Sequence, residues 1–317
     1  MDNYKGSQNQ KRLEIALAAD RNMEIGLHVT LYSALASLAL SGSFVNLHLF
    51  LKDYDLERVK RLHMTLHEFT GKYALHLYDT TAINLGKSRG IYGNKMTLVR
   101  IHIPDSLKVE RFIYLDADLL VLTDLRALFS FPLNNNVAAV VSNTIIKNVW
   151  HLERDALLKC GMPDNARYFN AGVMLIDARR WRENNYTEKC VALMDKHPSQ
   201  FPSADQAILN IILYNRVAFL PEKFNVPFFT REPVLDLRFH HDILCHFLDS
   251  PKPWDIGAEL IHASYPAFKQ FLQKTYFSGY RTYAYFDIEK VKRTLAILIT
   301  YLRFWRNAHK TKKSLYA

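Results

Sequence analysis

The chain has 317 residues, of which 49% are hydrophobic and 23% are charged. This composition excludes a wholly disordered chain and is sufficient for one large domain, alone or with a small appendage. The formal net charge is +10, and residues 289–317, with eight basic residues and one acidic residue, contribute +7 of it. Nucleic-acid-binding domains more often carry positive charge on the fold itself, so a charge confined to the last segment argues against that class.

Cysteine usage and hydropathy indicate the compartment. Cys160, Cys190 and Cys245 are scattered and lack CxxC spacing, which favours buried free thiols in a reducing compartment over a disulfide framework or a zinc knuckle. Residues 1–12 are polar and do not resemble a signal peptide. No run reaches the roughly 18–20 apolar residues that span a bilayer. We therefore expect a cytoplasmic protein, for which contact with a membrane surface is still allowed.

The first part of the chain alternates between strand and helix patterns. Apolar runs bounded by polar or glycine-containing turns predict strands at 13–19, 45–51 and 74–78. Helix-like stretches lie between them, at 25–40 and 56–69. This alternation predicts an α/β fold in which helices flank a mostly parallel, Rossmann-like sheet.

The second part continues with less regular spacing. The expected elements are a helix at 96–103 that ends at Pro104, a strand at 111–115, strands at 137–141, 171–176 and 217–220, and a helix at 204–214. After about residue 266 the chain becomes aromatic and basic. We therefore predict a main domain at 1–266 and a C-terminal extension at 267–317.

Two carboxylates follow the predicted strand at 111–115. Asp116 and Asp118 stand at its carboxyl end, where the loops of a parallel sheet converge on ligands. The chain turns there, so both side chains can reach one cation. A hard divalent ion takes such oxygen ligands and often completes its shell with phosphate oxygens. The residues alone also allow two surface carboxylates in a turn.

Other polar residues have both a functional and a structural interpretation. Asp20 and Asn22 follow the first strand, where they can bind a nucleoside or cap a helix. Arg100 can grip a phosphate or form a surface salt bridge. His246 can be a third metal ligand, and Lys252 can stabilise a diphosphate. Without further context, a structural histidine and a solvated lysine are the alternatives.

Several segments, taken in order, resemble glycosyltransferase family 8, whose members include galactosyl- and glucosyltransferases of lipopolysaccharide outer cores. The resemblance covers roughly residues 13–255. The matching segments are 18–22, 96–101, 114–121, the FNAGV run within 168–173, the DQAILN run at 205–210, and His246 followed by the KPW run at 252–254.

The resemblance implies a GT-A fold and a retaining, metal-dependent hexosyltransferase with a UDP-hexose donor. It implies that Asp116, Asp118 and His246 hold Mn²⁺ or Mg²⁺, and that Gln206, Asp205 and Arg100 are catalytic. The donor-binding residues that it implies are Ala18, Asp20, Asn22, Arg100, Asp116, Ala117, Asp118, Asn170 and Lys252.

Retention at the anomeric carbon bears on Gln206. A two-step retaining route normally uses a carboxylate nucleophile, whereas the resemblance places an amide where the nucleophile should be. An amide oxygen is a poor nucleophile, which favours a same-face, ion-pair route with a UDP oxygen as base and Asp205 binding sugar hydroxyls. Without the resemblance, Asp205 and Gln206 are a helix cap and a first-turn residue, and Asn170 forms a turn before a strand.

The C-terminal extension has an amphipathic pattern. Val291, Leu295, Leu298, Leu302 and Trp305 recur at helical spacing beside a basic face. Such a helix suits the surface of an anionic bilayer. The alternative is a docked helix that covers the domain. We expect peripheral association with the cytoplasmic face of the inner membrane.

The resemblance to family 8 implies transfer of galactose or glucose from a UDP-sugar to a lipopolysaccharide- or lipooligosaccharide-type saccharide, with an α-glycosidic product. The choice of donor sugar and the linkage are open at this stage. One alternative is a haloacid-dehalogenase-like phosphatase. That class usually has Gly or Thr soon after the second Asp, whereas this chain has Leu119 and Leu120 there. The other is a non-enzymatic basic peripheral-membrane or nucleic-acid-binding module, which leaves the ordered motifs unexplained.

Overall fold

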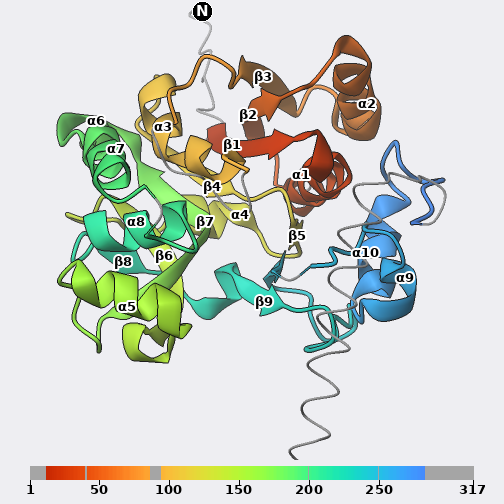
Figure 1. The fold of residues 1–317 in the computed structure, drawn as a ribbon. Helices are drawn as coiled ribbons and strands as arrows, with labels where there is room; N and C mark the ends of the chain where they lie inside the picture. The colour runs from red at the N-terminus through yellow and green to blue at the C-terminus, as the bar shows by residue number, and fades with distance from the viewer. Residues whose placement is uncertain (1–11, 40, 86–93, 199, 249, 283–317) are drawn as a thin grey trace, which may run out of the picture.

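A seven-stranded sheet organises the protein in a computed structural model that describes residues 12–39, 41–85, 94–198, 200–248 and 250–282 (Figure 1). Its strands are, in spatial order, β3 (Tyr73–Asp79), β2 (Phe44–Lys52), β1 (Arg12–Asp20), β4 (Arg111–Leu115), β7 (Arg167–Asp177), β6 (Ala138–Ile145) and β8 (Val217–Phe219). Neighbours pair in parallel from β3 to β4 and between β6 and β8, whereas β7 is antiparallel to both β4 and β6. The predicted α/β fold with a mostly parallel sheet is confirmed.

Helices cover both faces of this sheet (Figure 1). The helices are α1 (Glu24–Leu38), α2 (Leu56–Leu66), α3 (Val99–Ser106), α4 (Leu125–Phe129), α5 (His151–Lys159), α6 (Ala178–Glu183), α7 (Tyr186–Lys196), α8 (Asp205–Ile212), α9 (Ala258–Ile261) and α10 (Tyr265–Leu272). Apolar side chains of α1, α2 and α4 pack on one face, and those of α3, α6, α7 and α8 pack on the other. In β1, Leu13, Ile15 and Leu17 join the first cluster and Ala16 joins the second, because successive side chains of a strand alternate.

A second, three-stranded sheet has the order β5 (Leu119–Val121), β10 (Leu244–Phe247) and β9 (Val226–Phe228). The central strand β10 is antiparallel to β5 and parallel to β9. These strands have no recognisable pattern in the sequence, because they are only three or four residues long and their polar and apolar residues do not alternate. This sheet brings the chain around residue 246 against the turn that follows β4.

The observed bounds of most elements differ from the predicted ones by one or more residues, and two of these differences have a clear physical reason. The helix α3 continues past Pro104 to Ser106. Because proline lacks a backbone N–H, a proline near the end of a helix removes only one helical hydrogen bond, and the helix can continue for a few residues. In addition, Arg182 donates a hydrogen bond to the Pro104 carbonyl at 2.7 Å. The strand β7 begins at Arg167, because its first part pairs with β6 across a register irregularity. Asn170 therefore lies inside a strand, and the prediction of a turn residue there is wrong.

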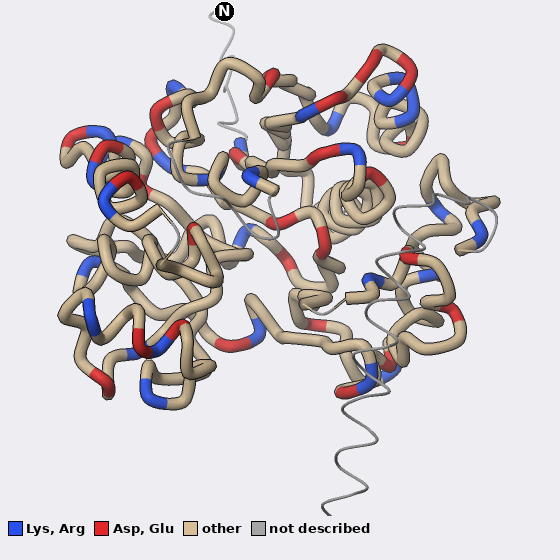
Figure 2. The backbone as a smooth tube through the Cα atoms, in the orientation of Figure 1, with Lys and Arg blue, Asp and Glu red and all other residues tan. Residues whose placement is uncertain are grey.

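The end of the described chain packs into the fold. Phe268 and Leu272 of α10 belong to an apolar cluster with Ile25 and Trp254, and the predicted boundary after residue 266 falls inside α10. The amphipathic and basic part of the predicted extension, at 283–317, lies outside the described residues. In the part of the chain that the structure describes, no helix is long and apolar enough to cross a bilayer. Basic and acidic residues are interspersed along the described backbone (Figure 2), in keeping with the charge of +3 that remains when the +7 of 289–317 is subtracted from +10.

Candidate active site

The segment Asp116-Ala117-Asp118, called the DxD turn below, lies next to His246 at the junction of the two sheets. Asp116 and Asp118 lie in the turn between β4 and β5, and the pairing of β10 with β5 places His246 opposite Leu119. His246 Nε2 is 3.2 Å from Asp118 Oδ1 and 3.8 Å from Asp116 Oδ2. One ligand atom from each of the three residues lies within 4.8 Å of the others. Two carboxylates and one imidazole are a suitable donor set for a divalent cation such as Mn²⁺ or Mg²⁺.

Two close backbone approaches shape this cluster. The Asp116 N–H donates to the Gly172 carbonyl of β7 at 2.8 Å. A Cβ at Gly172 would overlap the His246 ring and lie 2.7 Å from Asp116 Oδ2. A Cβ at Gly26 in α1 would likewise overlap the carbonyl oxygen of Ala117. Only glycine allows β7 and α1 to contact the DxD turn this closely.

Asp118 supplies an independent sign that the cluster fits a cation. In the described structure its Oδ1 is buried and accepts no hydrogen bond, which leaves a costly unsatisfied oxygen facing the cluster. Its Oδ2 pairs with Lys252 Nζ at 2.8 Å. Burial alone raises the pKa of Asp118, but the ammonium of Lys252, the strongest opposing influence, helps to hold that pKa below its usual range. Asp118 is thus in its metal-binding carboxylate form, and Lys252 is directed at the site rather than at solvent.

Arg100 links the cluster to α8. Its Nη2 is 2.9 Å from Asp116 Oδ1, its Nε is 2.9 Å from Asp205 Oδ2, and its Nη1 donates to the Ala171 carbonyl at 2.5 Å. Burial lowers the pKa of Arg100, but the carboxylates of Asp116 and Asp205 outweigh it and raise that pKa. The side chain is 6% exposed, so the alternative of a surface salt bridge is wrong: the ion pairs are buried.

Asp205 is nearly fully buried, and its carboxylate faces Arg100. Burial raises the pKa of Asp205 to about 6, although Arg100 acts in the opposite direction. The N-cap position of α8 is Ala204, and no side chain caps the helix there. The alternative that Asp205 caps the helix is therefore wrong.

Hydrogen bonds fix the orientation of the Gln206 amide. Its Oε1 accepts from the Ala171 N–H at 3.2 Å and from Asn170 Nδ2 at 3.1 Å, while its Nε2 donates to the Tyr168 hydroxyl at 3.0 Å. The Tyr168 hydroxyl donates in turn to the buried Glu153 at 2.8 Å. Because a backbone N–H only donates, the bond from Ala171 identifies the amide oxygen. Asn170 and Gln206 thus belong to one ordered polar network.

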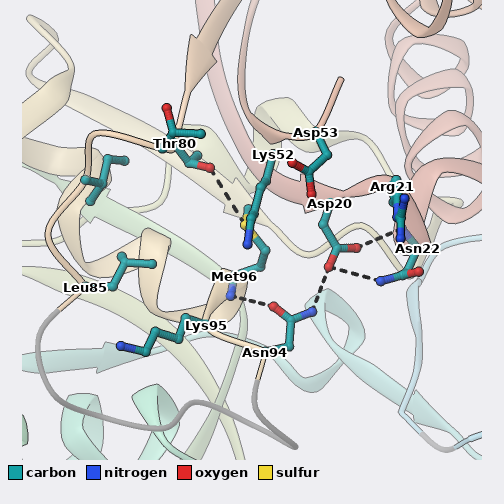
Figure 3. A pocket seen from close by; sticks show the side chains of 12 residues that line it. Asp20, Arg21, Asn22, Lys52, Asp53, Thr80, Leu85, Asn94, Lys95 and Met96 are labelled. Carbon is teal, nitrogen blue, oxygen red and sulfur yellow. Dashed lines mark hydrogen bonds between the residues drawn. The ribbon is translucent and has the colours of Figure 1, made fainter. Parts of the chain in front are cut away.

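A cavity of about 630 Å³ opens at the carboxyl ends of β1, β2 and β3 (Figure 3). Asp20 accepts from the Asn22 N–H at 2.9 Å and so caps the short 3₁₀ turn Arg21–Met23, which confirms the capping interpretation for Asp20. The N-cap position of α1 is Met23 rather than Asn22. Both side chains also line the cavity, and Asn94 Nδ2 donates to Asp20 Oδ2 at 2.7 Å. Since β1 and β4 are neighbouring parallel strands, the cavity and the DxD turn lie at the same edge of the sheet.

Two of the expected residues carry only a methyl side chain, and some members of the polar network were not predicted. Ala18 is half-buried in β1, and the side chain of Ala117 is buried in the core. Sequence reasoning missed Asn94, Tyr168 and Asn225, which bond to Asp20, Gln206 and His246 respectively. Asn94 and Tyr168 have only the signal of a polar residue near a predicted helix or strand, which many residues share, and Asn225 lies near no predicted element.

Comparisons with known proteins identify the family of this chain. The glycosyl transferase family 8 profile matches residues 14–257. The lipopolysaccharide 1,3-galactosyltransferase of Salmonella typhimurium is 27% identical over 86% of this chain and 80% of its own length. The lipopolysaccharide glucosyltransferase WaaO of Escherichia coli K12 is 22% identical over 88% of this chain and 91% of its own length.

The fold has a solved counterpart. The crystal structure of the galactosyltransferase LgtC, in complex with donor and acceptor sugar analogues, superposes with a TM-score of 0.66 at 19% identity, covering 87% of this chain and 98% of that one. At this identity the likeness shows the GT-A fold. The family match gives no support to the phosphatase or to the non-enzymatic module. The chain belongs to glycosyl transferase family 8 and is a retaining, metal-dependent hexosyltransferase.

Proposed function

We propose that this enzyme transfers galactose or glucose from a UDP-sugar to a lipopolysaccharide- or lipooligosaccharide-type saccharide and forms an α-glycosidic bond. The observation that carries the proposal is the Asp116–Asp118–His246 cluster, which lies at the same sheet edge as the cavity at Asp20. A nucleotide in the cavity could then extend its diphosphate toward the cluster. The lipopolysaccharide hexosyltransferases among the relatives support the acceptor class.

Each polar group has a role in donor binding under this proposal. Asp116, Asp118 and His246 hold Mn²⁺, or Mg²⁺, which supplies positive charge for the leaving diphosphate. Lys252, 2.8 Å from Asp118, supplies a second positive charge there. Asp20 and Asn22 bind the uracil or ribose, and they line the cavity from the end of β1.

The catalytic roles follow from the polar network beside the cluster. Gln206 Oε1 already accepts two hydrogen bonds, which supports electrostatic positioning of the sugar over nucleophilic attack. In the route we propose, the bond between the anomeric carbon and the UDP oxygen breaks. The acceptor hydroxyl then attacks the same face, and its proton passes to the departing UDP oxygen. Asp205 is buried and pairs with Arg100 at 2.9 Å, so in this route it fixes the direction of the guanidinium toward the donor, in place of the expected direct contact with sugar hydroxyls.

The acceptor class also suggests where the enzyme acts. We place it on the cytoplasmic face of the inner membrane, where the basic and aromatic residues of 289–317 would bind anionic lipid. The pattern that supports this placement lies outside the described residues.

A donor and acceptor screen tests the proposed function. UDP release from UDP-glucose and from UDP-galactose should be measured with Mn²⁺, with and without truncated lipopolysaccharide. We expect one donor to be preferred and its turnover to rise when the acceptor is added. NMR of the product should show an α-anomeric linkage. A β-linked product, or turnover of neither sugar, would contradict the proposal.

A further inference from the structure

Asn225 has no role in the reaction described so far. It is 4% exposed and stands immediately before β9. The strand β9 is parallel to β10, with Val226 paired with Cys245 and Pro227 with His246. This pairing brings the Asn225 side chain to the imidazole of His246, where Asn225 Oδ1 and His246 Nδ1 are 2.9 Å apart.

A backbone donor fixes the direction of the hydrogen bonds around Asn225. The Gly172 N–H donates to an Asn170 side-chain atom at 2.9 Å, so that atom is the acceptor Oδ1. Asn225 Nδ2 donates to the same oxygen at 2.9 Å. The other end of the Asn225 amide is then its oxygen, and this oxygen faces His246. An amide oxygen only accepts, so His246 Nδ1 carries a proton.

The protonation of Nδ1 determines what the rest of the ring can do. In a neutral imidazole with a proton on Nδ1, the lone pair lies on Nε2. Nε2 is the atom that faces Asp118 Oδ1 at 3.2 Å and Asp116 Oδ2 at 3.8 Å. We propose that Asn225 is a positioning residue that holds His246 in the tautomer presenting Nε2 to a divalent cation. This inference rests on the proposed metal site, and it explains why an asparagine is buried behind that site.

The test separates the two halves of the Asn225 amide. Asn225→Leu removes both hydrogen bonds at similar size. Asn225→Asp keeps an acceptor for His246 Nδ1 but loses the donor to Asn170. Mn²⁺ alone is the probe, titrated by the electron paramagnetic resonance signal of the free ion. Electron spin-echo modulation reports whether an imidazole nitrogen is bound to the metal, and His246→Gln gives the reference without it.

We expect Asn225→Leu to weaken Mn²⁺ affinity by about 10–100-fold, as outer partners of metal-bound histidines do, and to weaken the imidazole modulation. Asn225→Asp should keep both near the wild-type level. The matched control is Asn46→Leu in β2, which removes a hydrogen bond to Glu14 in a different part of the sheet. It should leave Mn²⁺ affinity unchanged.

Three results would overturn the inference. If the Asp and Leu variants weaken Mn²⁺ binding equally, the bond to Asn170 is what matters and Asn225 is a structural bridge. If neither variant changes the affinity, Asn225 does not act on His246. If wild-type protein shows no imidazole modulation while it binds Mn²⁺, His246 is not a ligand; the metal-dependent transfer would still stand, with another third ligand.

Discussion

At position 172 the chain has room for a hydrogen atom and nothing larger. The Gly172 carbonyl accepts from the Asp116 N–H, and an added Cβ would overlap the His246 ring. Gly172→Ala must therefore displace either the strand or two of the three metal ligands. We expect a folded protein whose Mn²⁺ affinity and transfer rate both fall at least tenfold, measured by calorimetry and by UDP release.

The control for this prediction is Gly279→Ala. Among the described residues, no atom beyond its two chain neighbours lies within 4 Å of a Cβ at Gly279, and its backbone is not in the positive-φ region. That variant should behave as wild type. Wild-type Mn²⁺ affinity in Gly172→Ala would show that β7 does not define the site.

His28 should make the protein sensitive to mild acid. It lies in α1 beside Thr65 Oγ1 at 2.6 Å, and burial lowers its pKa to about 3. Below about pH 6.5, His28 becomes protonated in the unfolded chain, whereas it stays neutral in the folded chain. Stability is therefore lost as the pH falls toward the folded-state pKa, by about 2 kcal/mol between pH 7 and pH 5.

Urea unfolding at several pH values checks this expectation. His28→Gln cannot titrate, so its unfolding free energy should fall less than that of wild type over the same range. Parallel pH curves for the two proteins would show that His28 is not responsible.

At the scale of elements, α10 buries one face in the core through Tyr265, Ala267, Phe268 and Leu272. Phe268 is 1% exposed, and its ring centroid lies 5.8 Å from that of Phe247 and 5.6 Å from that of Trp254. Truncation of such a side chain costs about 3–5 kcal/mol. We expect Phe268→Ala to lower the free energy of unfolding by that amount in urea titrations.

Leu260 is the matched control, because it is 86% exposed in the neighbouring helix α9. Leu260→Ala should change stability by less than about 0.5 kcal/mol. Equal, small effects of both substitutions would mean that α10 is a detachable part of the extension predicted from residue 267.

The elements that could be predicted are those whose pattern is local. The run Leu13–Ala19 is apolar apart from Glu14, and it forms a strand with buried side chains on both faces. The DxD turn could be found because it follows such a strand. The strand of His246 could not be predicted, because β10 is four residues long and is held by pairing with β5, far away in sequence. The contact of Asn225 with His246 could not be predicted for the same reason, because it depends on the pairing of β9 with β10.

The whole molecule has an uneven distribution of charge. The described body mixes both signs along its backbone (Figure 2), whereas 289–317 alone carries eight basic residues and one acidic residue. Deleting 289–317 removes this charge and no residue of the active site. Each basic residue near an anionic surface contributes about 1 kcal/mol, and salt screens that attraction.

We therefore expect the truncated protein to hydrolyse free donor normally but to transfer poorly to an acceptor embedded in vesicles. Sedimentation with anionic vesicles should show binding of the intact chain that weakens at high salt and is small after truncation. An unfolded or insoluble truncated protein would contradict this expectation and assign the segment to the core.

The central claim is that the enzyme works through a metal held by Asp116, Asp118 and His246. UDP release from the preferred donor, measured for wild type and Asp118→Asn with Mn²⁺ or with excess EDTA, tests it directly. The exposed Asp155→Asn in α5 serves as control, since Asp155 pairs only with its neighbour Arg154 among the described ion pairs. Wild type and control should be active with Mn²⁺ and inactive with EDTA, and Asp118→Asn should be slower by about 10²–10³-fold with its fold intact. Turnover by Asp118→Asn at the wild-type rate in excess EDTA would contradict the metal site and the mechanism built on it.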